Sequence, residues 1–396
     1  MGIRRMFDRL KRIAIVVAAL LPWGAMQAQI LVGAACTDHY LPLLDGKRVA
    51  VCGNQTSMVG NTHLVDTLIG SGVRPVKIFC PEHGFRGNAE AGAHIASSTD
   101  PQTGIPIVSL YGKNKKPTPE QMADIDIVLF DLQDVGCRFY TYISTLHYVM
   151  EAAAESGKQV IVLDRPNPNG YYVDGPVLDP NFSSFVGMHP VPVVYGMTIG
   201  EYARMINGER WLKGGVQCAL TVIEMEGYTH QTRYALPVPP SPNLQTPEAI
   251  LLYPSLCFFE GAAVSVGRGT LTPFQIYGFP GLRGGDYAFT PVAIKGVSEN
   301  PPYKNQQCRG YDLTAFAADH LDSAGCLQIE YLLNAYRLFP DKEKFFTNAN
   351  FFDKLAGTDR LRLQVLNGVS EKNIRASWQE GLEKFKAVRE RYLLYE

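Results

Sequence analysis

The sequence predicts an α/β fold in which helices cover both faces of a doubly wound, mostly parallel sheet. Two observations carry this prediction. Between Lys47 and Pro166, short apolar runs alternate with segments of helical periodicity, which is typical of repeated βαβ units. The runs are apolar throughout instead of alternating with polar residues, as expected for strands covered on both faces. The five predicted strands span residues 48–52, 76–80, 105–110, 126–130 and 159–163.

Helices are predicted between and after these strands. The clearest runs from about Tyr142 to Ser156, with apolar residues at helical spacing, and Gly157 follows it as a C-terminal stop. After Pro166 come loops rich in Pro and Gly, a second predicted helix over 198–212 and an apolar run over 219–223. Long ordered loops of this kind tend to carry function in α/β proteins.

The last part of the chain has a different character. From about Gly281 the sequence changes to loops and then to helices rich in charged residues. The final helix is predicted to be amphipathic, with an apolar face formed by Ile374, Trp378, Leu382, Phe385 and Val388. We therefore predict a leader over 1–28, a larger α/β domain over 29–280 and a smaller α+β domain over 281–396.

The net charge conceals a basic leader. The 396-residue chain has 37 Lys+Arg and 38 Asp+Glu, a formal charge of −1, but its first 28 residues hold five basic residues and one acidic residue, which leaves −5 on the remainder. An apolar run over 13–21 and small residues up to Ala28 complete the pattern of a secretory signal peptide. We predict cleavage after Ala28 and an exported protein, periplasmic or secreted. The apolar run is too short to span a membrane, and the balanced charge gives no reason to expect nucleic-acid binding.

The eight cysteines are expected to be mostly buried free thiols, although export would permit disulfides. Cys52 and Cys80 lie within apolar runs, where a thiol behaves as a small core residue. Cys308 and Cys326 form the one pair that we would test for a bridge. No two cysteines are three residues apart, and no H-E-x-x-H, P-loop or G-x-G-x-x-G motif occurs, so we expect no metal and no nucleotide cofactor.

Every predicted strand is followed by a polar segment that contains glycine. Ligands of open parallel sheets bind at the carboxyl ends of the strands, so these segments together predict a site for a polar ligand. Tyrosines in or beside them would suit stacking on sugar rings. The segments span residues 53–56, 81–87, 111–112, 131–140 and 164–170.

Carboxylates are the candidate reactive groups. Glu82 follows the second strand, where Phe85 would desolvate it and raise its pKa, as a proton donor requires. Asp134 leaves the fourth strand, and Glu260 ends an apolar stretch. Two carboxylates across a cleft suit glycoside hydrolysis. Ser265, in a segment that approaches a nucleophile elbow, would instead support an esterase or deacetylase.

The strand ends and the later loops carry a set of distinctive motifs. They are Gly53–Thr56, Phe79–Gly87, Leu110–Gly112, Asp131–Tyr142, Asp164–Pro168, Gly196–Glu201, Ser241–Asn243, Glu260–Gly261, Gly267–Thr270 and Pro273–Phe274. Together these motifs resemble the exo-β-N-acetylmuramidase family of bacterial peptidoglycan hydrolases, and the likeness covers nearly all of the chain after the leader. The first motif departs slightly, because Gly53 and Ser57 stand where the family usually has Thr and Gly around an Asn-Gln-Thr centre.

The resemblance implies a Rossmann-like catalytic domain, an auxiliary C-terminal domain and an active site between them. It also implies release of N-acetylmuramic acid from the non-reducing end of peptidoglycan fragments, with muropeptides as substrates. Glu82 matches the family's P-E-H-G glutamate and is the first choice for a catalytic carboxylate. The second role is open between Glu260 and Asp134, and a route assisted by the substrate's N-acetyl group would need only one acid. A muropeptide-binding protein without catalysis is a further alternative.

An arginine would suit the lactyl carboxylate of muramic acid, because a guanidinium can hold a carboxylate through two hydrogen bonds. The candidates are Arg86, Arg138, Arg165 and Arg268, each with a structural ion pair as its alternative role. The other predicted substrate-binding residues are Asn54, Gln55, His83, Tyr142, Asn167 and Asn243.

Overall fold

The computed structural model describes residues 30–81, 85–86, 98–321 and 325–396. Leu31–Glu396 form one compact unit. The leader lies outside the described residues, so cleavage after Ala28 stays a prediction, as does the domain boundary at 280/281. None of the described helices combines the length and apolar character that a membrane span requires.

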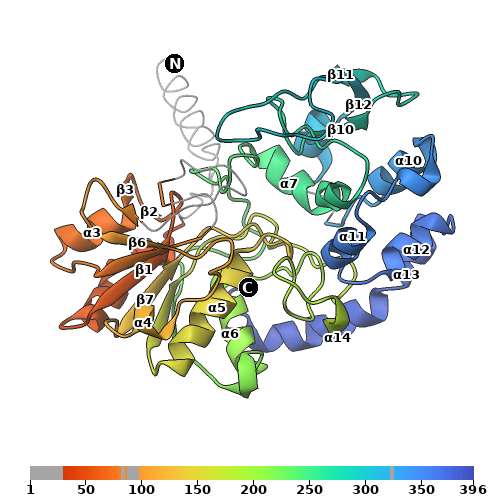
Figure 1. Cartoon of the computed structure of the whole chain (residues 1–396). Helices are drawn as coiled ribbons and strands as arrows, with labels where there is room; N and C mark the ends of the chain where they lie inside the picture. The colour runs from red at the N-terminus through yellow and green to blue at the C-terminus, as the bar shows by residue number, and fades with distance from the viewer. Residues whose placement is uncertain (1–29, 82–84, 87–97, 322–324) are drawn as a thin grey trace, which may run out of the picture. The chain divides into compact units, whose positions relative to one another are not determined.

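Seven strands form the central sheet, and they comprise β1 Val49–Gly53, β4 Lys77–Cys80, β5 Ser98–Thr99, β6 Pro106–Ser109, β7 Ile127–Asp131, β8 Gln159–Leu163 and β9 Ala219–Ile223 (Figure 1). Their spatial order is β5-β6-β4-β1-β7-β8-β9, and all neighbours are parallel except β5, which runs antiparallel to β6. Numbered along the chain, the six parallel strands have the spatial order 3-2-1-4-5-6, that of dinucleotide-binding folds. The predicted α/β fold class is confirmed.

Alternate residues along the central strands face two separate cores. Val51 of β1 lies in one core with helix α3 (Leu64–Gly70). The neighbouring Cys52 lies in the other core with α5 (Tyr142–Glu155) and α6 (Ile199–Gly208). This alternation explains the uniformly apolar strand sequences, because both faces of the sheet are covered.

The predicted helix over 142–156 corresponds to α5, and Gly157 has a φ of +64°, as expected for a glycine after a helix. The predicted helix over 198–212 is shorter, because α6 ends at Gly208. Its start is fixed by a capping box, in which the Thr198 hydroxyl and the Glu201 carboxylate each accept the other residue's backbone N–H. The remaining elements before α6 are α2 Thr37–Tyr40, β2 Met58–Val59, β3 Thr62–His63 and α4 Pro119–Met122.

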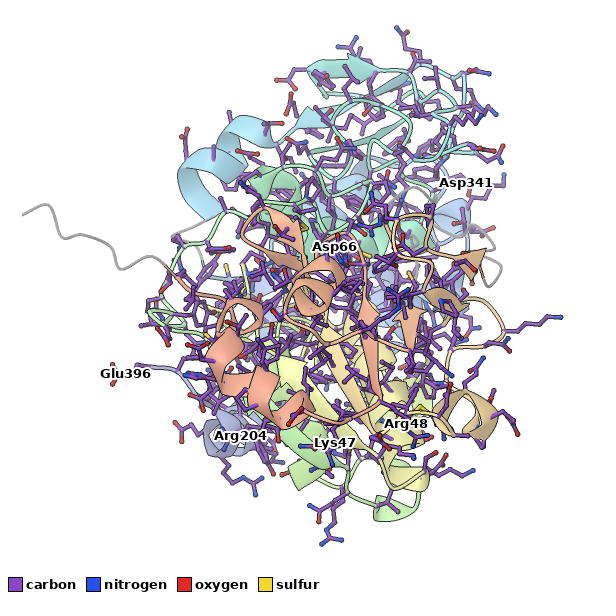
Figure 2. All side chains as sticks on the ribbon, turned by 90° about the vertical axis from the view of Figure 1, so that its left-hand side faces the viewer. Lys47, Arg48, Asp66, Arg204, Asp341 and Glu396 are labelled. Carbon is purple, nitrogen blue, oxygen red and sulfur yellow. The ribbon has the colours of Figure 1, made fainter. Side chains whose placement is uncertain are left out.

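The rest of the chain adds helices and a three-stranded antiparallel sheet of order β10-β12-β11. In Figure 2, Lys47 and Arg48 lie at the lower end of the view, where β1 begins, and this second sheet lies at the upper end. The elements are α7 Pro247–Leu256, β10 Ile276–Phe279, β11 Tyr287–Phe289, β12 Cys308–Asp312, α8 Thr314–Phe316, α10 Glu330–Leu338, α11 Ala349–Ala356, α12 Arg360–Leu366, α13 Glu371–Ala376 and α14 Gln379–Arg389.

The predicted single amphipathic helix at the end of the chain is wrong in one respect. Its apolar face is buried, but α13 and α14 are separate helices with Ser377 and Trp378 between them. The Ser377 hydroxyl donates to the carbonyl of Ile374 at 2.6 Å, which ends α13 from within its last turn. Trp378 then caps α14 with its own indole ring buried.

Candidate active site

The loop after β1 is joined to the loop after β7 at the point where the strand order reverses. Asn54 Nδ2 donates to the Tyr142 hydroxyl at 2.6 Å. Gln55 Nε2 and the Tyr140 hydroxyl donate to the carbonyl of Pro240 at 3.4 and 2.8 Å. Reversal of the strand order leaves a crevice between diverging loops, which is the usual ligand site of such sheets. Two predicted binding residues, Asn54 and Gln55, therefore hold the loops around this crevice.

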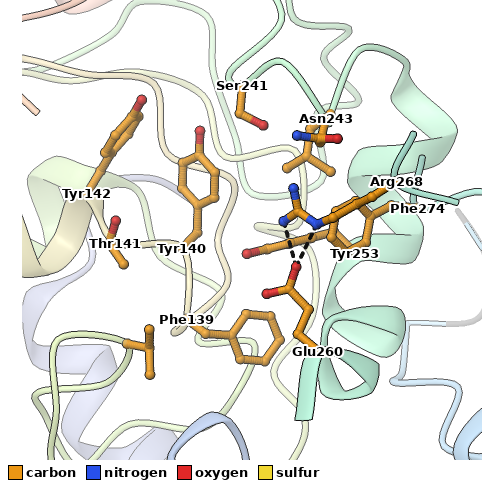
Figure 3. A pocket seen from close by; sticks show the side chains of 12 residues that line it. Phe139, Tyr140, Thr141, Tyr142, Ser241, Asn243, Tyr253, Glu260, Arg268 and Phe274 are labelled. Atoms are coloured by element: carbon orange, nitrogen blue, oxygen red, sulfur yellow. Dashed lines mark hydrogen bonds and ion pairs between the residues drawn. The ribbon is translucent and has the colours of Figure 1, made fainter. Parts of the chain in front are cut away.

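A cavity opens beside these loops. Four residues predicted from the sequence meet in it, namely Tyr142, Asn243, Glu260 and Arg268 (Figure 3). The other lining residues are Phe139, Tyr140, Thr141, Val186, Ser241, Leu244, Tyr253 and Phe274.

Glu260 and Arg268 form an ion pair in the wall of this cavity (Figure 3). Arg268 Nε and Nη2 both donate to Glu260 Oε1, at 2.9 and 2.5 Å. Among the described residues, Glu260 Oε2 accepts only from the Cys257 thiol at 3.9 Å, and a thiol is a weak donor. The side chains of Glu260 and Arg268 are 25% and 24% exposed. One carboxylate oxygen is thus held by the guanidinium, while the other is available to a ligand.

Local structure explains how both side chains reach the cavity. Glu260 lies in a short 3-10 helix, Cys257–Gly261, that continues α7 and is otherwise buried. Arg268 stands between Gly267 and Gly269, which have φ values of +77° and +80°. A Cβ atom on Gly267 would lie 2.6 Å from the side chain of Ile276. Only glycine allows this tight path, which turns Arg268 back toward Glu260.

Aromatic rings make up much of the remaining wall. Tyr253 packs edge-on against Tyr140, Phe139 and Phe274, with ring centroids 5.0 to 6.0 Å apart. The guanidinium of Arg268 lies 5.0 Å from the ring of Phe274, a cation–π contact that restrains its plane. Burial raises the pKa of the Tyr253 phenol well above its usual value, so this hydroxyl stays neutral at physiological pH.

The same ion pair lines a second cavity. Glu260 and Arg268 are the charged residues of that cavity, and its other walls are mostly apolar. Glu260 and Arg268 therefore separate a polar, aromatic cavity from a more apolar one. The remaining lining residues of the second cavity are Phe259, Ala262, Ala263, Val264, Val266, Pro302, Tyr303, Thr347 and Phe351.

Arg138 does not line either cavity. Its side chain is fully buried, with Nη1 donating to the carbonyls of Pro176 and Val191 at 2.8 and 2.6 Å. Nη2 donates to the carbonyl of Leu355 at 2.9 Å. Burial lowers the pKa of this guanidinium to about 10, which still leaves it charged at neutral pH. In this structure Arg138 connects three chain segments.

Arg165 and Asn167 also have protein partners. Arg165 binds the buried Asp131 through Nε and Nη2, at 2.5 and 2.9 Å, and both side chains are at most 5% exposed. Asn167 Nδ2 donates to the carbonyl of Met197 at 2.8 Å, and its Oδ1 accepts from the Asn169 N–H at 2.8 Å. Both residues hold the loop after β8 in place and neither lines the cavity around Tyr142.

Glu82 and His83 lie outside the described residues, and the residues that flank them are anchored. Phe85 is buried and packs edge-on against His63 at 4.7 Å. Arg86 binds both oxygens of the buried Asp100, at 3.0 and 2.9 Å, and also contacts Asp66 at 3.5 Å. The structural ion pair that was the alternative role of Arg86 is therefore present, with aspartates as its partners.

Asp134, the other candidate for the second carboxylate, is enclosed by protein. Its Oδ2 accepts from the Tyr195 hydroxyl and from the Gly136 N–H, and it does not line the Glu260 cavity. Burial raises the pKa of Asp134 to about 6, against the lowering effect of these hydrogen bonds. Glu260, not Asp134, is therefore the candidate that meets Arg268 in the cavity.

Ser265 has none of the surroundings of a nucleophile. It is fully buried, and its hydroxyl accepts from the Gly267 N–H at 3.2 Å. Its backbone pairs with Gly278 in both directions, at 2.8 and 3.0 Å, which extends the small sheet at β10. A fully buried hydroxyl in a strand-like segment cannot reach a substrate, so the esterase alternative loses its structural basis.

All eight cysteines are free thiols in the structure, and Cys308 and Cys326 are not bonded to each other. One group of three potential metal ligands occurs in the described part of the chain, Cys36, His39 and Glu226, with ligand atoms within 4.8 Å of one another. Burial and the charge of Glu226 raise the pKa of the Cys36 thiol. We assign no metal to this group.

Tyr253 lines the cavity but was not predicted from the sequence. It precedes Glu260 by seven residues, or about two helical turns, so both side chains emerge on the same side of α7 and its continuation. That spacing is the signal that would have found it. Phe139 and Phe274 lie inside motifs quoted above, where they were not singled out as binding residues.

Comparison with known proteins places the chain in a family. The model of the N-terminal part of exo-β-N-acetylmuramidase NamZ matches residues 49–248, and the model of its C-terminal part matches residues 251–395. The chain belongs to the exo-β-N-acetylmuramidase NamZ family. The resemblance found in the motifs is confirmed, and with it the expected enzyme class, because the NamZ family is one of glycoside hydrolases.

Individual NamZ-family relatives agree over nearly the whole length. The chain is 38% identical over 375 residues to the peptidoglycan β-N-acetylmuramidase NamZ of Bacillus subtilis strain 168, covering 90% of this chain and 89% of that protein. Two crystal structures of DUF1343 family proteins from Bacteroides fragilis each cover 93% of this chain and 99% of their own. Their identities are 46% and 29%, with TM-scores of 0.86 and 0.78.

Proposed function

We propose that this chain is an exo-acting β-N-acetylmuramidase that releases N-acetylmuramic acid from the non-reducing end of peptidoglycan fragments. The observation that carries the proposal is the Glu260–Arg268 pair in an aromatic cavity at the crevice of a NamZ-family chain. Aromatic rings stack on the apolar faces of sugars, and a carboxylate beside them stabilises the positive charge of a glycosyl transition state.

Two carboxylates share the chemistry in this proposal. The terminal sugar occupies the cavity, and Glu260 Oε2 faces its anomeric carbon while Oε1 stays bound to Arg268. Glu82 protonates the glycosidic oxygen as the bond to the anomeric carbon breaks. Water then supplies the new hydroxyl to that carbon and gives its other proton to the Glu82 carboxylate, which restores the acid. The role of Glu82 rests on its place in the P-E-H-G motif that follows β4.

The test is hydrolysis of the disaccharide in which N-acetylmuramic acid is β-1,4-linked to N-acetylglucosamine. Wild-type protein is expected to release both sugars, and binding without hydrolysis would support the muropeptide-binding alternative. Glu260→Gln and Glu82→Gln should each lower the rate by roughly 10² to 10⁴. Glu330→Gln is the matched control, because that side chain is exposed on α10. Near-normal turnover by Glu260→Gln would show that Glu260 is not catalytic. It would favour the route in which Glu82 is the acid and the substrate's N-acetyl group assists.

Export of the protein is part of the proposal. It is supported by the basic start, the apolar run and the small residues that end at Ala28. Expression of the full chain in a bacterial host, followed by N-terminal sequencing of the protein from the periplasm or the medium, should give Gln29 as the first residue. Ala28→Arg should block processing, because the cleavage site requires a small residue there. An unprocessed wild-type protein would overturn the prediction.

A further inference from the structure

Arg268 has hydrogen-bonding capacity that the ion pair does not use. Nε and Nη2 both point at a single oxygen of Glu260, and Nη1 has no acceptor within the described part of the chain. The guanidinium is restrained on one side by Glu260 and on another by the ring of Phe274. In Figure 3 its third nitrogen points away from Glu260, toward Ser241 and Asn243 across the cavity. A fixed, partly exposed donor of this kind suits an anionic ligand.

The other three arginines predicted from the sequence are not available for such a ligand. Both terminal nitrogens of Arg138 donate to backbone carbonyls, and the side chain is fully buried. Arg165 binds Asp131 through two nitrogens, and its Nη2 also donates to the carbonyl of Met58 at 3.0 Å. Arg86 is held by Asp100. Of the four, Arg268 is the one that lines the two cavities beside Glu260.

We propose that Arg268 binds the lactyl carboxylate of muramic acid through Nη1, so that the substrate's anion and Glu260 share one guanidinium. This proposal rests on the proposed function and adds the group that distinguishes muramic acid from N-acetylglucosamine, which lacks the lactyl ether. Both sugars have the same ring and the same N-acetyl group. The lactyl carboxylate is therefore the charged group by which a binding site can distinguish muramic acid from N-acetylglucosamine.

Binding of an anionic sugar requires a positive charge in the cavity itself, because the molecule as a whole is negatively charged. The chain after the leader carries a formal charge of −5, so its overall field does not attract an anionic sugar. Glu260 lies within hydrogen-bonding distance of Arg268, and an incoming carboxylate would be repelled if that guanidinium were absent. Arg268 thus has two tasks in the proposal, which are to orient Glu260 and to select substrates that carry the lactyl acid.

The experiment compares three chromogenic β-glycosides on the mature protein. They are the N-acetylmuramide, the same compound with its lactyl acid converted to the methyl amide, and the N-acetylglucosaminide. Arg268→Lys keeps the charge and removes the fork of donors. The matched control is Arg362→Lys, because Arg362 also binds a carboxylate, that of Asp353, through Nε and Nη2 and is 20% exposed.

For wild type, we expect the amide and the glucosaminide to have KM values about 10- to 100-fold above that of the acid, the range of one lost charge-assisted hydrogen bond. Arg268→Lys should raise KM for the acid by a similar factor and leave KM for the amide nearly unchanged. Equal losses for acid and amide in Arg268→Lys would overturn the proposal, because they would mean that Arg268 only orients Glu260. Arg362→Lys should leave all three KM values as in wild type.

Failure of the proposed function would look different. If wild type hydrolyses none of the three glycosides, the activity itself is wrong, and the anion site is then tested by calorimetry without turnover. Free N-acetylmuramic acid should bind more tightly than its lactyl methyl amide to wild type, and with equal affinity to Arg268→Lys. Equal binding of both compounds to wild type would reject the anion site as well.

Discussion

The buried pair of Arg165 and Asp131 should contribute far more to stability than a pair of the same geometry at the other end of the same strand. Asp131 ends β7, and Asp126 precedes it. Each aspartate receives two hydrogen bonds from Nε and Nη2 of one arginine, Arg165 or Arg48. The buried pair is 5% and 0% exposed, whereas the other is 51% and 34% exposed (Figure 2 labels Arg48).

Arg165→Met leaves the Asp131 carboxylate buried without a partner, which costs about 3 to 5 kcal/mol. It also leaves the carbonyl of Met58 without its donor. Arg48→Met frees a carboxylate that water can hydrate, so its effect should be a small fraction of that loss. Adding Asp131→Asn to Arg165→Met removes the orphaned charge and should restore part of the stability.

The assay is urea-induced unfolding at pH 7, followed by circular dichroism, with free energies obtained by linear extrapolation. The mature wild-type protein and the three variants are compared at one salt concentration, because salt screens the exposed pair more than the buried one. Equal losses in Arg165→Met and Arg48→Met would refute the reasoning. So would a further loss on adding Asp131→Asn, since that result would show that the unpaired carboxylate is not the source of the cost.

Three further predictions follow from the candidate site and its surroundings. Ser265→Ala should hydrolyse the muramic-acid disaccharide at the wild-type rate, and loss of that activity without loss of the folded circular dichroism spectrum would show that Ser265 takes part in the reaction after all. Glu260→Gln should inactivate the protein while its urea midpoint stays near wild type, because the side chain is partly exposed and Gln can still accept from Arg268. Burial raises the pKa of Asp134 to about 6 in the folded protein, above its usual value. The folded state therefore binds more protons than the unfolded state between about pH 4 and 6, and stability falls as pH rises through that range. Unfolding midpoints measured across that range should fall less steeply in Asp134→Asn, and an unchanged slope would contradict the shift.

Most of the sheet was predictable because the sequence of each strand is recognisable without its neighbours. A strand covered on both faces must be apolar throughout, and residues 159–163, for example, were predicted with the bounds that β8 has. The segment at the end of the chain was less predictable. Ser377 and Trp378 are compatible with helical spacing, and the break between α13 and α14 depends on a local hydrogen bond to Ile374 that competes with helix continuation.

Sequence by itself determined the fold class, the polar segments at the strand ends and the family, because these depend on local patterns and on motifs that stay together along the chain. It also named four of the residues that line the cavity, which are Tyr142, Asn243, Glu260 and Arg268. Tertiary structure alone decided among chemically equivalent candidates. Arg138 donates to Leu355, 217 residues away, and Asp134 is enclosed by Tyr195, 61 residues away. A charged side chain either faces a cavity or is buried in hydrogen bonds to other parts of the protein. Which of the two occurs depends on partners far away in the sequence, which no local pattern encodes.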